Sequence, residues 1–305
     1  MSHTDGGLSI AITLGDPRGI GPEITRKALQ DSRVRALGVT WRVVGPTGTE
    51  QPVDESIGAW LPTGDPQADI ARAGALAGRA VLRAADMALA GDVQGIVTAP
   101  LDKAALLAGG FDYPGHTEML GARAGVETTM MLASDKLRVV LATTHIALRD
   151  VLGALTLERI VRTANATRKG LRDAFSIAEP RIALCALNPH AGDGGRFGDE
   201  DDRILAPAAR AAGIAGPFPA DTVFVRAMRG EFDAVIAPYH DVGMTAIKVA
   251  SFGDAVNVTL GLPFVRTSPD HGTALDIAGR GLASAESMIA AMQMAVRLIK
   301  KRGAD

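Results

Sequence analysis

The chain has 305 residues, of which 47% are hydrophobic and 22% charged, a balance typical of a globular protein with one large domain or two ordinary ones. The net charge of −2 offers no basic surface to a phosphate backbone, so we expect no nucleic-acid partner. The single cysteine, Cys185, excludes a disulfide framework and a cysteine-based zinc cluster. No apolar run approaches the roughly 18–20 residues that span a bilayer, and no basic stretch followed by an apolar one opens the chain. We therefore expect a cytoplasmic protein with no membrane partner.

Short aliphatic runs alternate with longer helical patterns. In chain order the sequence predicts a strand at 8–14, a helix at 23–37, strands at 39–44 and 93–97 on either side of a helix at 68–90, a strand pair at 129–132 and 137–143, a helix at 157–175, a strand at 181–187, a helix at 201–212, strands at 234–237 and 255–260, and a helix at 284–301. Residues 46–68 contain several Gly and Pro with little periodicity, which indicates a loop. Strands that alternate with helices favour an α/β fold, with a mostly parallel sheet covered on both faces.

Three histidines follow predicted strands directly. His145 comes after the strand at 137–143, His190 after that at 181–187, and His240 after that at 234–237. Ligand sites in parallel sheets lie at the carboxyl ends of the strands, and neutral imidazoles suit zinc and other divalent ions. The pattern is consistent with a metal site assembled by the fold, and equally with three local loop hydrogen bonds. Asp241, beside His240, is placed to orient a ligand or carry a proton, or simply occupies a turn.

Two further segments collect polar residues. The motif GHTE opens a helix pattern, where backbone N–H groups with His116 and Thr117 could hold an anion, or Thr117 could be a plain N-cap. Lys248, Asn257 and Arg266 lie in or beside apolar stretches. Lysine and arginine match phosphate and carboxylate groups, and a strand asparagine needs a partner; the alternative is a set of surface groups at strand ends.

Several standard chemistries are missing from the sequence. It has no Gly-x-Gly-x-x-Gly after a strand, no phosphate loop, and no GxSxG, HExxH or CxxC motif. Cys185 lies inside an apolar strand and is expected to be a buried thiol. Asp16 and Arg18 form a glycine-flanked turn after the first strand, which is either a tight structural connection or part of an active-site rim.

Taken together, these segments resemble the 4-hydroxythreonine-4-phosphate dehydrogenase family. The resemblance rests on motifs in fixed order along almost the whole chain: GDPRGIGPEI, TAPLDK, GHTE, TTH, NPHAGDGG, PADTVF, YHD and VNVTLGLPFVRTSPDHGTALDIAG. It implies an α/β fold of the isocitrate and isopropylmalate dehydrogenase type, with two α/β/α domains and the active site in the cleft between them. The expected domains are residues 1–115 with 250–305, on the cofactor side, and residues 116–249, for metal, substrate and dimerisation. A homodimer with the active site at its interface is also implied.

The resemblance also carries roles to individual residues. It implies a divalent metal ion (Zn, Mg, Co or Mn) held by His145, His190 and His240. It implies substrate binding by His116, Thr117, Lys248, Asn257 and Arg266, and it makes Lys248, Asp241 and Asp221 the candidate catalytic residues. The HGTALDIAG segment resembles a loop that binds the adenine side of NAD or NADP without a Rossmann turn, through His271, Gly272, Thr273, Ala274 and Asp276.

The chain departs from the family pattern in three places. Val242 stands where Gln is common, and residues 244–247 replace a proline-containing segment; we expect both on the rim of the site. Asp102 stands where Asn is frequent.

The implied reaction is the NAD-dependent oxidation and decarboxylation of 4-phosphooxy-L-threonine to 3-amino-2-oxopropyl phosphate, a step of vitamin B6 (pyridoxal 5'-phosphate) biosynthesis. Related enzymes act on D-threonate or D-erythronate 4-phosphate, and others on aromatic cis-dihydrodiols. Two other classes fit the polar residues: a metal-dependent hydrolase or lyase that acts on a phosphorylated acid without NAD, and a non-catalytic small-molecule-binding protein. A hydrolase or lyase that works without NAD would not need the adenine-side loop, and a binding protein would not need three converging histidines.

Overall fold

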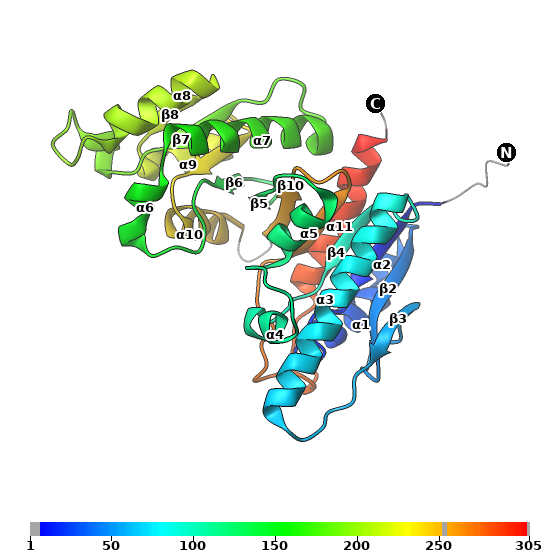
Figure 1. The fold of residues 1–305 in the computed structure, drawn as a ribbon. Coiled ribbons are helices and arrows are strands. Elements are labelled where there is room, and N and C mark those ends of the chain that lie inside the picture. Colours follow the sequence, from blue (N-terminus) through cyan, green and yellow to red (C-terminus); the bar gives the residue numbers. More distant parts are fainter. Residues whose placement is uncertain (1–6, 252–254, 304–305) are drawn as a thin grey trace. The chain divides into compact units, whose positions relative to one another are not determined.

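The computed structural model describes residues 7–251 and 255–303, and the chain divides into two compact units. Unit 1 consists of Met1–Thr128 and Leu262–Asp305, and unit 2 of Thr129–Gly261. Unit 1 is thus built from both ends of the chain, coloured blue to green and orange to red in Figure 1. These boundaries lie beyond the ones expected at 115 and 249, so the segment that contains His116 belongs to unit 1 and the last strand of the middle segment to unit 2.

Unit 1 contains five strands and six helices among its described residues: β1 (Ser9–Thr13), α1 (Gly21–Gln30), α2 (Ser32–Arg35), β2 (Thr40–Thr47), β3 (Glu55–Ala59), α3 (Pro66–Ala90), β4 (Gly95–Thr98), α4 (Lys103–Ala108), α5 (His116–Ala124), β11 (Val265–Pro269) and α11 (Glu286–Arg302). The strands lie in the order β3-β2-β1-β4-β11, and every pair is parallel. All their carboxyl ends therefore meet at one edge of the sheet.

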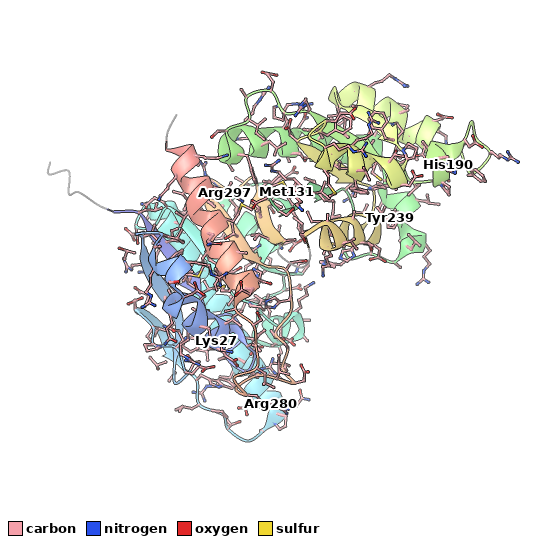
Figure 2. All side chains as sticks on the ribbon, turned by 180° about the vertical axis from the view of Figure 1, so that it is seen from behind. Lys27, Met131, His190, Tyr239, Arg280 and Arg297 are labelled. Atoms are coloured by element: carbon pink, nitrogen blue, oxygen red, sulfur yellow. The ribbon has the colours of Figure 1, made fainter. Side chains whose placement is uncertain are left out.

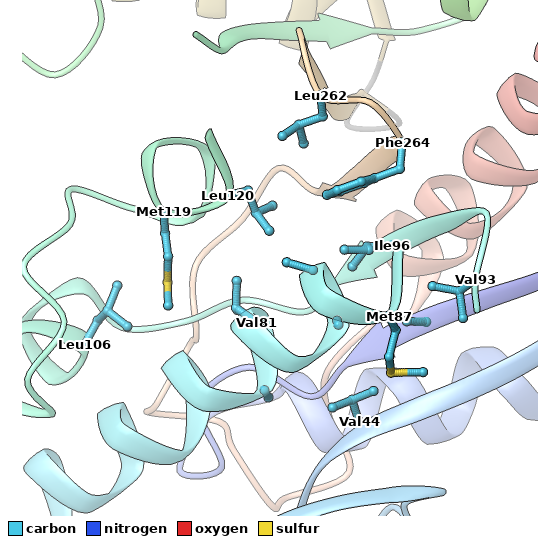
Figure 3. Close-up of a cluster of buried hydrophobic side chains, with 14 residues drawn as sticks. Val44, Val81, Met87, Val93, Ile96, Leu106, Met119, Leu120, Leu262 and Phe264 are labelled. Atoms are coloured by element: carbon cyan, nitrogen blue, oxygen red, sulfur yellow. The ribbon is translucent and has the colours of Figure 1, made fainter. Parts of the chain in front are cut away.

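Helices cover both faces of the unit 1 sheet. Ile96 of β4 packs with Val81 and Met87 of α3 in a buried apolar cluster, shown in Figure 3. The neighbouring Gly95 faces α11, because a Cβ at Gly95 would lie 2.8 Å from Ile299 Cδ1. Successive residues of a strand point to opposite faces, so α3 and α11 cover opposite sides of the sheet.

Unit 2 contains the remaining elements of the described chain: β5 (Thr129–Ala133), β6 (Arg138–Leu141), α6 (Leu148–Ala154), α7 (Leu157–Phe175), β7 (Ile182–Cys185), a 3-10 turn (Pro189–Gly192), a π-turn (Asp201–Leu205), α8 (Ala206–Ala212), β8 (Ala215–Phe218), α9 (Ala220–Met228), β9 (Ala234–Ala237), α10 (His240–Ser251) and β10 (Val256–Leu260). Its strand order is β10-β5-β6-β9-β7-β8. The pairs β10–β5 and β5–β6 are antiparallel and the others parallel. Helices α9 and α10 pack on an apolar cluster drawn from β5, β6, β7 and β9.

The mostly parallel α/β architecture predicted from the sequence is confirmed. Two local predictions were wrong. The region 46–68 contains the edge strand β3, paired in parallel with β2, and the helix expected at 23–37 is interrupted at Asp31. Asp31 has extended backbone angles and its side chain accepts the N–H of Arg33 at 2.8 Å, which caps the short helix α2. Among the residues that the structure describes, no helix combines the length and apolarity needed to cross a membrane.

Candidate functional site

The connection from β1 to α1 is a tight polar turn at the carboxyl edge of the unit 1 sheet. The buried Asp16 carboxylate accepts the backbone N–H of Arg18 at 2.9 Å and the Arg18 guanidinium at 3.0 and 2.6 Å. The backbone N–H of Asp16 donates to the carbonyl of Pro100, just after β4, at 3.0 Å. The Asp16–Arg18 pair therefore has a structural use: it fixes the turn and ties the ends of two neighbouring strands together.

Arg266 on β11 is a buried cation beside the end of β4. Its side chain is 2% exposed, and Nη2 donates to Thr98 Oγ1 at 2.6 Å. Burial lowers the pKa of the Arg266 guanidinium to about 9, while the Glu118 carboxylate acts in the opposite direction. A desolvated cation gains strongly from an anionic ligand, so this position suits a phosphate or carboxylate.

His116 is the first residue of α5 and lies near two cations. Burial, and then the positive charges of Arg266 and Lys103, lower the pKa of the His116 imidazole well below its ordinary 6.5. The ring is therefore neutral at physiological pH. Its Nε2 atom is buried and has no hydrogen-bond partner within residues 7–251 and 255–303. We call Thr98, Lys103, His116 and Arg266 the anion-binding corner.

The start of α5 has no side-chain cap. Gly115 is the N-cap residue and makes no side-chain hydrogen bond, so the interpretation of Thr117 as an N-cap is wrong. Backbone N–H groups in the first turn of a helix have no partner within the helix and favour negative charge. They add to the positive potential of the anion-binding corner.

Two members of this corner, Thr98 and Lys103, were not among the predicted site residues. Both belong to the TAPLDK motif directly after a predicted strand, which was the available signal. Lys103 is exposed and opens α4, and its Cε lies 3.9 Å from where a Cβ on Gly115 would be. Asp102 caps α4 by accepting the N–H of Ala105 at 2.7 Å. Asparagine caps helices equally well, so this departure from the family pattern preserves the local structure.

The predicted cofactor residues lie in the loop between β11 and α11. His271, Gly272 and Asp276 are exposed, and His271 Nδ1 lies 3.1 Å from the Gly272 carbonyl oxygen. Ala274 has a left-handed φ of 42°, and the carbonyl of Thr273 accepts the N–H of Ile20 at 2.9 Å. Most of the loop is thus open to a ligand, while Thr273 is tied to the start of α1.

In unit 2 the three predicted metal ligands follow the adjacent parallel strands β6, β9 and β7. The rings of His145 and His240 come together, with centroids 5.5 Å apart. Asp241 Oδ1 lies 2.7 Å from His240 Nδ1, which leaves Nε2 as the atom for a ligand. His190 lies instead in its own loop against Phe197, with ring centroids 6.4 Å apart (Figure 2). Among the described residues, no three His, Cys, Asp or Glu side chains form a group that could hold a metal ion.

The loop that carries His190 is held by a buried carboxylate that sequence reasoning missed. Asp201, 1% exposed, accepts the backbone N–H groups of Leu187 at 2.8 Å and Asn188 at 2.9 Å. The Asn188 side chain donates to Glu200 at 2.8 Å. Asp201 begins a predicted helix, and nothing in its local sequence separates such a loop anchor from an ordinary first-turn acid.

The remaining predicted residues are spread over three elements of unit 2. Asp221 is exposed in the first turn of α9, and Lys248 is exposed on α10. Asn257 pairs with Leu132 across β10 and β5, which places both side chains on the face covered by α9 and α10. Its Oδ1 atom is buried and accepts no hydrogen bond from the described part of the chain, which agrees with the expectation that this amide needs a further partner.

The expectation that Val242 and residues 244–247 form a rim was wrong. Met244 and Ile247 are buried in the apolar cluster of unit 2, and Val242 and Ala246 pack against it. Met244 and Ile247 face the sheet because the helical repeat turns them inward from α10, whereas Thr245 between them is exposed. The departures from the family pattern therefore change core packing of unit 2.

Cys185 has the environment of an inert thiol. It is fully buried on β7, and burial raises the pKa of the thiol to about 12. The prediction of a buried thiol is confirmed.

These features define an α/β protein in which a buried cation, a neutral histidine and an uncapped helix start lie together in unit 1. Residues 27–295 match the protein family described as "Pyridoxal phosphate biosynthetic protein PdxA", and the chain belongs to this family of dehydrogenases, which use a nicotinamide cofactor. The expected oxidoreductase class is thereby confirmed over the hydrolase and binding-protein alternatives.

Individual relatives cover nearly the whole chain. The chain is 44% identical to 4-hydroxythreonine-4-phosphate dehydrogenase of Geobacter metallireducens, over 96% of this chain and 96% of the relative. It is also 44% identical to D-threonate 4-phosphate dehydrogenase of Salmonella typhimurium, over 95% and 98%. The crystal structure of 4-hydroxythreonine-4-phosphate dehydrogenase from Klebsiella pneumoniae superposes with a TM-score of 0.79 at 40% identity, over 96% and 100%.

A more distant likeness concerns the fold alone. Isocitrate dehydrogenase from Methylococcus capsulatus is 18% identical with a TM-score of 0.53, over 97% of this chain and 87% of that one. The predicted isocitrate dehydrogenase-like fold class is confirmed.

Proposed function

We propose that this protein oxidises 4-phosphooxy-L-threonine with NAD or NADP and releases carbon dioxide, which gives 3-amino-2-oxopropyl phosphate for pyridoxal 5'-phosphate biosynthesis. The anion-binding corner is the observation that carries the proposal. It presents buried Arg266, neutral His116 and the uncapped start of α5 to an anion. The relatives named for 4-hydroxythreonine 4-phosphate support the choice of substrate.

The reaction has a simple balance. Carbon 3 of the substrate loses its hydroxyl proton to a base and a hydride to the nicotinamide, so it becomes a ketone. The carboxylate is then β to that ketone and leaves as carbon dioxide, and a proton replaces it. In unit 1, Arg266, His116 and Thr117 would bind the phosphate or carboxylate, and the loop from His271 to Asp276 would bind the adenine side of the cofactor.

In unit 2 the imidazoles that follow β6, β9 and β7 are donors of the type that a divalent metal ion binds, although the described side chains do not form a three-ligand group. His145 and His240 would hold it, with His190 joining from its loop. When bound, such an ion supplies Lewis-acid polarisation of a hydroxyl or carbonyl oxygen. Asp241 contacts His240 Nδ1 and would fix the ring, which makes Asp241 an orienting group rather than the base. Lys248 and Asp221 are the candidates for the proton acceptor, with Lys248 and Asn257 as further substrate contacts.

The test is the absorbance of NADH at 340 nm after the protein is mixed with NAD, a divalent metal and 4-phosphooxy-L-threonine. We expect turnover that a chelator abolishes and that added metal restores. Turnover that survives exhaustive chelation would overturn the metal part of the proposal, and no turnover with either nucleotide would overturn the dehydrogenase assignment to this substrate.

The second candidate substrate is D-threonate 4-phosphate. It is favoured by the relative from Salmonella typhimurium, whose identity to this chain equals that of the 4-hydroxythreonine enzyme from Geobacter metallireducens. The two substrates carry an amine or a hydroxyl at carbon 2. The ratio of their kcat/KM values, measured with D-erythronate 4-phosphate alongside, decides between them.

We also propose that the working form is a homodimer. Ile146, Leu148 and Leu152 follow His145 closely and are 44%, 68% and 50% exposed. Exposed aliphatic groups gathered on one short segment are typical of a surface that a partner covers. Sedimentation equilibrium is expected to give twice the 31.6 kDa of one chain; a mass of one chain would refute the proposal.

A further inference from the structure

The loop between β11 and α11 is fastened to α1 by a charged pair. Glu23 and Lys27 stand one helical turn apart on α1, and Lys27 Nζ donates to Glu23 Oε1 at 2.7 Å. Glu23 is 1% exposed, and the Lys27 side chain is 30% exposed. Figure 2 shows Lys27 on α1 in the same unit as the loop residue Arg280.

Every donor of the Lys27 ammonium is used. Besides Glu23, it donates to the carbonyl of Gly281 at 2.9 Å and to that of Ala283 at 2.7 Å. An ammonium has three donors, so this group is fully satisfied. Glu23 Oε1 in turn accepts the backbone N–H of Ala283 at 3.0 Å. The pair thus holds both the N–H and the C=O of one loop residue, which fixes that backbone in position and orientation.

A second attachment lies at the other end of the same loop. The N–H of Ile20, at the start of α1, donates to the carbonyl of Thr273 at 2.9 Å. Gly19 packs closely there, because a Cβ at that position would lie 2.8 Å from the Thr273 oxygen. Ile20 and Lys27, which make the two attachments, are seven positions apart, a rise of roughly 10 Å along a helix. The segment 274–280, whose residues are exposed or partly exposed, is therefore held at both ends by one helix.

We propose that Glu23 and Lys27 are positioning residues that hold the 273–283 loop in the conformation that receives the nicotinamide cofactor. The inference rests on the proposed cofactor role of that loop. Neither side chain needs to contact the cofactor: the helix sets the loop, and a loop ordered in advance loses less conformational entropy when the ligand binds.

The test compares the wild-type chain with Lys27→Met, Lys27→Arg and the control Arg26→Met. Lys27→Met removes the three hydrogen bonds but keeps the length of the side chain. Lys27→Arg keeps the positive charge but replaces the compact ammonium with a planar guanidinium. The guanidinium cannot donate from a single nitrogen to all three acceptors of the ammonium. Arg26→Met removes a neighbouring charge from the same helix, where the Arg26 guanidinium bonds to the exposed Glu50 at 3.1 Å.

Two measurements are made on each folded variant. Trypsin cleavage after the exposed Arg280, followed by mass spectrometry, reports the opening of the loop without any cofactor. Steady-state kinetics report KM for NAD separately from kcat and from KM for the phosphorylated substrate. For Lys27→Met we expect both the cleavage rate and KM for NAD to rise about tenfold, with kcat little changed. Lys27→Arg should change both in the same direction, and Arg26→Met should match the wild type.

Unchanged cleavage in Lys27→Met would refute the attachment. Faster cleavage with unchanged KM for NAD would refute the positioning role, since the loop would then be held for structural reasons only. A wild-type protein that neither binds nor reduces NAD or NADP would instead overturn the proposed function and the cofactor part of this inference with it. The wild-type kinetics distinguish that failure from the other two.

Discussion

Replacement of Arg266 by methionine tests the anion-binding corner most sharply. The side chain is 2% exposed and lies against Thr98, so methionine fills the same space without a charge. Removal of a buried cation also removes its desolvation cost, so we expect the fold to persist. An anion bound here receives at least one hydrogen bond from the guanidinium, and such a charge-assisted bond contributes about 1.5–3 kcal/mol. Lys103 and His116 remain in the variant, so only the free energy of the Arg266 hydrogen bond is lost. We therefore expect KM for the phosphorylated substrate to rise about 10- to 150-fold.

The assay is the initial rate of NADH formation across a substrate titration, with Arg42→Met as the matched control. The Arg42 side chain is 39% exposed, and its Nη2 atom lies at the long ion-pair distance of 3.7 Å from Glu55 Oε2. Replacement of Arg42 by methionine should therefore leave KM unaltered. A second readout needs no turnover: inorganic phosphate should raise the Tm of the wild type and not that of Arg266→Met. Equal KM values and equal phosphate-induced shifts in Tm for Arg266→Met and the control would refute the reasoning.

Three further changes have defined outcomes. His190→Ala should abolish metal-dependent turnover while circular dichroism stays native; full metal-dependent activity in this variant would remove His190 from the metal site. Burial by itself would raise the pKa of the Glu23 carboxyl, but hydrogen bonds from Lys27 and Ala283 lower it below its ordinary 4.5. The ionised Glu23 therefore stabilises the fold above pH 4.5, and this stabilisation is lost as the pH falls through the folded-state pKa of Glu23. The difference in unfolding free energy between the wild type and Glu23→Gln, measured with urea, should shrink over that pH range. A difference that stays constant with pH would contradict this account. Cys185, whose thiol pKa is raised by burial to about 12, should not react with a disulfide reagent at pH 8 until the protein is unfolded, and fast labelling of the native protein would contradict its burial.

The elements that the sequence predicted well are those with a strong apolar pattern. The amphipathic helix expected at 157–175 is α7, and the strand expected at 234–237 is β9. Buried strands appear in the sequence as continuous aliphatic runs, so the residues at their carboxyl ends could be located from the sequence. Because His145 and His240 follow such runs, their proximity could be anticipated.

Other features depend on tertiary contacts that leave no local pattern. The edge strand β3 has only two partly buried residues among its five, so it lacks an apolar run. Val242 is next but one to His240 in sequence, yet the helical repeat of α10 turns it toward the core. Lys27 and Ala283 are 256 residues apart, and only the folded chain brings them together. The division into units at residues 128 and 261 likewise follows from contacts within the folded chain and differs by about a dozen residues from the approximate boundaries expected at 115 and 249.

The measurement that tests the central claim most directly is the ratio of kcat/KM for 4-phosphooxy-L-threonine to that for D-threonate 4-phosphate, followed at 340 nm with NAD and a divalent metal. We predict a ratio well above one, with carbon dioxide released in step with NADH. A ratio below one would keep the dehydrogenase class and move this protein to the sugar-acid substrates. NADH formation without release of carbon dioxide would contradict the oxidative decarboxylation itself.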